Sequence, residues 1–154
     1  MMKAMDAAAY LAQKYMSKYN EAIDEMKLHK LMYFAQRECL IATDAPLFDA
    51  VFYGWKYGPV LREIRSAYKN ETFAPNIPDV LPKENVCILD AAFEKYSGKD
   101  SWSLSRLIHG ELSWKNSRIG IGEYENSDNP MTLEDIRKDA ERIKERRKNY
   151  LNWG

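Results

Sequence analysis

Apolar side chains recur at intervals of three and four residues along much of this chain, which is the spacing of one face of an α-helix. The widest apolar arc lies between residues 27 and 42, and Phe34 and Ile41 broaden it further. Asp24 precedes this stretch in the position of an N-cap. We therefore predict a central helix over about 27–42. Its buried stripe is expected to consist of Leu28, Leu31, Met32, Ala35, Cys39 and Ala42.

The same spacing predicts further helices on both sides of the central one. These are helices over 6–19 and 59–69, one that ends at Gly98, a short one capped by Ser101 or Ser103, and a last one that begins at Thr132. The expected fold class is mainly α, with about six helices in a single compact domain spanning residues 1–154. The last helix should finish in a charged, solvated end at about 144–154, because basic and acidic residues alternate there.

An aromatic segment with two glycines interrupts the helical pattern at Phe52–Val60. The residues before it, at 47–53, are aromatic and β-branched enough to predict a short strand, so a strand or hairpin is expected near 47–55. Gly58 can turn at little steric cost, and Pro59 suits the first position of a helix. We therefore expect the extended segment to become a helix at Pro59. The aromatic side chains Phe52, Trp55 and Tyr57 suit a core or an exposed anchor, and the composition favours the core.

Two stretches predict long loops. Three prolines, Pro75, Pro78 and Pro82, exclude regular structure over 70–82. Glycine, asparagine and aspartate mark a turn-rich segment over 120–130.

Charge and composition exclude several classes of function. The 23 basic residues balance the 23 acidic ones, so no overall field favours nucleic acid or an anionic membrane. Arg142, Arg146 and Arg147 could contact phosphates, but interleaved glutamates weaken their field. No stretch approaches the apolar length of a membrane span, and the N-terminus does not resemble a signal peptide. We expect a cytoplasmic protein in which Cys39 and Cys87 are buried, reduced thiols.

The sequence carries little recognisable chemistry. The two histidines and two cysteines show no close pairing of metal ligands, and phosphate loops and nucleophile elbows are absent. We expect no metal, no cofactor and no enzymatic activity. His109 and Glu111 form the best candidate acid–base pair, and they can face each other only if the helix has ended by Gly110. The alternative, which we favour, is that His109 lies beside Trp114 and fixes a loop.

Three motifs in a fixed order resemble the Panacea domain, also described as SocA-like or phage-associated. They are L-x-K-L-x-Y-x-A-Q at 28–36, W-x-Y-G-P-V at 55–60 and H-x-E-x-x-W at 109–114, with Ala45-Pro46-Leu47-Phe48 between the first two. The chain departs from the family pattern where Gly54 replaces a common alanine, Arg37 a common glycine and Ser113 a common proline. The residues that the resemblance marks as scaffold or as toxin contacts are Lys30, Tyr33, Gln36, Trp55, Lys56, Tyr57, Gly58, Pro59, His109, Glu111 and Trp114.

The resemblance implies the antitoxin of a bacterial or prophage toxin–antitoxin pair, which neutralises the toxin of a neighbouring gene by direct binding. Motif residues would then hold the scaffold, while the loops at 70–82 and 120–130 select the toxin. Two alternatives are an adaptor that delivers the toxin to a protease and a DNA-binding autoregulator. A small hydrolase that uses His109 and Glu111 is the enzymatic alternative.

Overall fold

The structure is a computed structural model that describes residues 1–153. Within this range the chain forms seven helices and a small antiparallel sheet, so the mainly α fold class is confirmed. The helix beyond the six expected ones is α6, which at six residues is too short to show an apolar period. The helices are α1 (Ala4–Tyr19), α2 (Glu25–Thr43), α3 (Arg62–Lys69), α4 (Lys83–Tyr96), α5 (Ser101–His109), α6 (Leu112–Ser117) and α7 (Leu133–Trp153). The strands are β1 (Phe52–Trp55), β2 (Gly58–Leu61) and β3 (Pro130–Met131).

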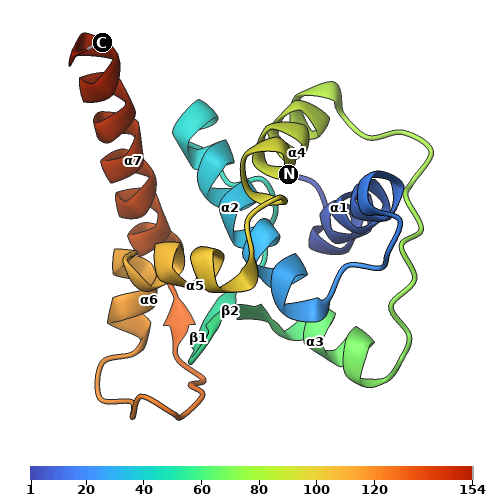
Figure 1. The fold of residues 1–154 in the computed structure, drawn as a ribbon, viewed down its shortest axis with the longest axis horizontal. Coiled ribbons are helices and arrows are strands. Elements are labelled where there is room, and N and C mark those ends of the chain that lie inside the picture. Colours follow the sequence, from blue (N-terminus) through green and yellow to red (C-terminus); the bar gives the residue numbers. More distant parts are fainter. Residues whose placement is uncertain (154) are drawn as a thin grey trace.

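Helix α2 is the central helix, as its broad apolar arc predicts. It contacts α1, α3, α4, α5, α7 and β2, and it runs through the middle of the molecule (Figure 1). The Asp24 side chain caps it by accepting a hydrogen bond from the Lys27 amide at 2.9 Å. Every residue from 28 to 40 is buried, and this run includes charged side chains that must find partners inside the protein.

The aromatic segment forms a hairpin and not the start of a helix. Strand β1 pairs with β2, placing Trp55 opposite Gly58 and Gly54 opposite Pro59. The prediction of a helix from Pro59 was wrong, since α3 begins only at Arg62. Proline is tolerated here because β2 is an edge strand in the order β2-β1-β3, where a missing N–H leaves no neighbour unpaired. The strand or hairpin expected near 47–55 is confirmed, although its first strand begins only at Phe52.

Two local predictions were also wrong. The N-cap of α5 is Asp100, which accepts a hydrogen bond from the Ser103 amide at 2.8 Å, and not Ser101 or Ser103. Both cysteines are free thiols, but Cys87 is exposed and only Cys39 is buried. Cys87 lies off the face of α4 that buries Leu89, Ala92 and Phe93.

The long loop at 70–82 has no helix or strand, as the prolines predict, and residues 118–129 form a second irregular segment. Figure 1 shows the two loops at opposite ends of the long axis of the molecule. Residues 144–151 at the charged end of α7 are exposed except Arg147, which is half-buried and binds the Glu38 side chain. Gly154, the last residue of that predicted end, lies outside the described residues. Within 1–153, no helix combines the length and the apolar character that a membrane crossing requires.

Candidate functional site

The tip of the β1–β2 hairpin is held against α5 and α6 by side chains of the sequence motifs. The Trp114 Nε1 donates a hydrogen bond to the Trp55 carbonyl at 2.9 Å, and Ser105 Oγ donates one to the Tyr57 carbonyl at 2.9 Å. The His109 ring stacks on Trp114, with 4.0 Å between ring centroids and 18° between planes. The 109–114 motif and Ser105 therefore hold the hairpin tip through its backbone carbonyls, and the expected core position of Tyr57 was wrong, because its side chain is 51% exposed.

Lys30 lies under the next residue of the hairpin, Gly58. Lys30 is 2% exposed, and burial lowers the pKa of its ammonium group. Gly58 has a φ of +141°, a conformation that residues with a side chain rarely adopt. A Cβ atom at this position would lie 3.3 Å from Lys30 Cε. Position 58 therefore requires glycine for both its backbone and its space.

Gln36 binds the chain segment that follows α2. Its Nε2 donates to the Phe48 carbonyl at 3.0 Å, and its Oε1 accepts from the amides of Leu47 and Phe48 at 2.7 and 3.3 Å. On its other side this segment pairs with the N-terminus, since the Met2 amide donates to the Leu47 carbonyl at 3.0 Å and Met2 forms a parallel β-bridge with Phe48. The amide of Gln36 thus satisfies backbone groups at 47–48 that Met2 leaves unpaired.

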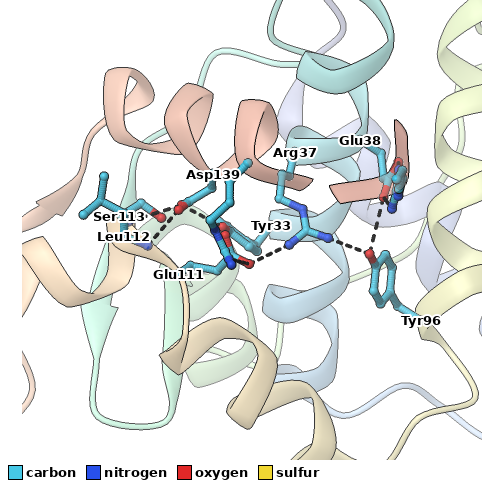
Figure 2. A network of polar contacts seen from close by, with 10 residues as sticks. Tyr33, Arg37, Glu38, Tyr96, Glu111, Leu112, Ser113 and Asp139 are labelled. Carbon is cyan, nitrogen blue, oxygen red and sulfur yellow. Dashed lines mark hydrogen bonds and ion pairs between the residues drawn. The ribbon is translucent and has the colours of Figure 1, made fainter. Parts of the chain in front are cut away.

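Buried charges on α2 connect to α4, α7 and the start of α6 (Figure 2). Arg37 donates to Glu111 Oε1 at 2.8 Å and to the Tyr96 hydroxyl at 2.6 Å. Tyr96 donates to Glu38 at 3.4 Å, and Arg147 binds both oxygens of Glu38 at 2.6 and 3.0 Å. We call Arg37, Glu38, Tyr96, Glu111 and Arg147, together with Tyr33, Asp139 and Arg142, the polar network.

Asp139 closes the network at the other end. It is fully buried and accepts hydrogen bonds from the Leu112 amide at 2.7 Å, the Ser113 amide at 3.2 Å and the Tyr33 hydroxyl at 3.1 Å. The first turn of α6 therefore rests on a carboxylate from α7, since amides at a helix N-terminus favour negative charge. Burial raises the pKa of Tyr33 well above its ordinary value, so its hydroxyl stays protonated as a donor.

The pKa values of the two glutamates of the network are shifted in opposite directions. Burial raises the pKa of Glu111, and nearby Asp139 raises it further against the opposing charge of Arg37. Burial would also raise the pKa of Glu38, but hydrogen bonds and charge from Arg147 outweigh it and hold that pKa below its usual range. Glu38 is therefore firmly ionised in the folded protein at neutral pH.

A comparison with models of protein families identifies the family to which this chain belongs. The family model described as "Antitoxin SocA-like, Panacea domain" matches residues 28–115, more than half of the chain. The chain belongs to this Panacea family. The searches of curated proteins and of solved structures found no match.

In this Panacea domain the candidate acid–base residues serve different partners. Glu111 binds Arg37 and Arg142, whereas His109 stacks on Trp114. Among the described residues no hydrogen bond joins His109 to Glu111, although the helix does end at His109. Burial lowers the pKa of His109, and its Nε2 is buried without a partner. The ring is thus placed as in the favoured alternative, beside Trp114.

Sequence reasoning missed three of the eight residues of the polar network. Glu38, Tyr96 and Asp139 belong to no motif, and Arg37 is noticeable only as a departure from the family pattern. One signal was present, because Glu38 interrupts the broad apolar arc of the central helix, whereas Arg37 lies opposite its centre. A buried charge needs a partner, so Glu38 indicated a polar contact without saying which residues complete it.

Proposed function

We propose that this protein is an antitoxin that neutralises the toxin of a neighbouring gene in the cytoplasm by binding it directly, without turnover. Family membership over residues 28–115 is the observation that carries the proposal. The structure supports a scaffold role for several motif residues. Tyr33, Gln36 and Glu111 are each at most 2% exposed, so they are hidden from any partner that binds the surface.

The exposed apolar side chains of the two long loops are the proposed toxin contacts. Val80 in the 70–82 loop is 84% exposed, and Ile119 and Tyr124 in the second loop are 73% and 81% exposed. Aromatic side chains such as Tyr124 are enriched among the residues that carry the energy of protein interfaces, and apolar neighbours add buried area around them. The 70–82 loop also borders a groove of about 430 Å³, which Met16, Tyr68 and Phe73 line.

The contact surface can be tested by charge substitution at one position in each loop. We expect Val80→Asp or Tyr124→Asp to weaken binding of the purified toxin by at least about tenfold, because a carboxylate would be buried in the interface. The melting temperature should stay unchanged, since both side chains are exposed. Calorimetric titration of the toxin into each variant measures the effect.

Val51→Asp is the matched control, because Val51 is 49% exposed and lies in neither loop. Its affinity for the toxin should equal that of the unmodified protein. Unchanged affinity in both loop variants would contradict the proposed surface.

Direct neutralisation also predicts that cells hold at least as much toxin with the antitoxin as without it. A falling toxin level that recovers in protease-deficient cells would indicate a proteolytic adaptor.

A further inference from the structure

A cavity of about 420 Å³ opens beside the polar network, between α5, α7 and the end of α4. Six of its lining residues are cationic: Arg37, Lys99, Arg106, Arg142, Arg146 and Arg147. We propose that this cationic cavity binds a small anion that carries two or more phosphate groups. The proposal is independent of the antitoxin role.

The charge around the cavity is far from the balance of the whole chain. The full sequence has 23 basic and 23 acidic residues, whereas the cavity is lined by six cations and a single carboxylate, Glu111. Lys99, Arg106 and Arg146 form no ion pair within residues 1–153. Positive charges grouped around one cavity repel one another, and a bound anion would offset this repulsion.

The deeper cations of the cavity are already fixed in place. Glu111 binds Arg37 and Arg142, and Glu38 binds Arg147 through two hydrogen bonds. Guanidinium groups held in this way lose little freedom when a ligand binds. Arg37 is 3% exposed, whereas Lys99, Arg106 and Arg146 are exposed and can reach a ligand.

The residue types favour phosphate over other anions. The planar fork of arginine matches two phosphate oxygens at once, and five of the six cations are arginines. The volume lies in the range of small-molecule pockets, and the cations converge on one hollow where a nucleic acid would need an extended stripe. Leu107 and Ile143 add an apolar wall that an organic part of the ligand could cover. The sequence has no phosphate loop, so side chains would supply the binding charge.

Calorimetric titration of the full chain with inorganic tripolyphosphate and with adenosine triphosphate, both without divalent cations, tests the proposal. We expect saturable binding at one site that weakens as salt rises. The double variant Arg106→Gln/Arg146→Gln should weaken binding by at least about tenfold, because it removes two charged contacts to the phosphates together. Its melting temperature should not change, since neither arginine bonds within the described residues.

Lys144→Gln/Lys148→Gln is the matched control, because it also removes two positive charges, both from positions on α7 that do not line the cavity. It should change affinity by less than about threefold. Equal affinity for the two probes means that the site binds only the phosphates. Tighter binding of adenosine triphosphate means that its nucleoside contacts the apolar wall that includes Leu107. Either result supports the proposal. The proposal is overturned if neither probe binds saturably at concentrations up to millimolar, or if the control variant loses as much affinity as the arginine variant. It is also overturned if an acidic peptide binds more tightly than either probe.

Discussion

Individual motif residues are fixed by space and by backbone hydrogen bonds. Gly58 leaves room for Lys30, which a Cβ at this position would crowd, and Gln36 satisfies three backbone groups at 47–48. The family resemblance could mark these positions from the sequence alone. It could not give their reasons, because Lys30 and Gly58 meet only when the hairpin folds onto α2.

Gly54, where the family commonly has alanine, shows how one position depends on a distant neighbour. A Cβ atom at this glycine would lie 1.9 Å from Ser117 Oγ and 2.9 Å from Ser117 Cβ. Gly54→Ala should therefore lower the free energy of unfolding by about 1–3 kcal/mol through overpacking. Urea denaturation of the variant measures this loss.

The double variant Gly54→Ala/Ser117→Gly should lose less stability than the sum of its single variants, because the clash is then removed. Gly98→Ala is the control, since its Cβ would meet only the Tyr19 hydroxyl at an ordinary 3.6 Å. If the losses of unfolding free energy in the two single variants simply add in the double variant, Ser117 is not what prevents a larger side chain at position 54.

Among the elements, the helices and the strand near 47–55 were predictable, but β2, β3 and the pairing of the strands were not. The apolar spacing of α2 and the cap at Asp24 are local features that a sequence displays directly. Strand β2 is defined by its pairing with β1, which no local pattern of Pro59 and Val60 reveals. The partners within the polar network are more distant still, because Arg37 and Glu111 are 74 residues apart and Glu38 and Arg147 are 109 apart.

The ion pair between Arg147 and Glu38 ties the projecting end of α7 to the central helix. Arg147→Ala should lower the free energy of unfolding by about 1–2 kcal/mol, a value reduced by solvent screening because the arginine side chain is 33% exposed. Thermal and urea denaturation at neutral pH measure the change. Lys144→Ala, an exposed position on the same helix, should stay within about 0.5 kcal/mol.

The pH dependence of this variant gives a second readout. The lowered pKa of Glu38 stabilises the folded state above the usual glutamate pKa, and this stability is lost as the pH falls through the lowered value. Without Arg147 the pKa should rise, so Arg147→Ala should lose less stability on acidification than the unmodified protein. Equal acid sensitivity of the two proteins would show that the ion pair does not hold Glu38 ionised.

At the scale of the whole molecule, a helical body surrounds α2, and two apolar-tipped loops lie at opposite ends (Figure 1). Fold class, loops and family could be predicted because they depend on local spacing and on a recognisable order of motifs. The cationic cavity could not be predicted, because its arginines come from three helices, α2, α5 and α7, at positions between 37 and 147. In the sequence those arginines look like parts of separate, charge-balanced helix surfaces.

Expression of the adjacent open reading frame, with and without this protein, tests the antitoxin role most directly. We predict that the neighbouring product alone stops growth, and that co-expression of this protein restores growth to the rate of the empty vector. The two proteins should also co-purify as a stable complex. A neighbouring product that is harmless alone, or toxicity that persists while this protein is present and folded, would contradict the account.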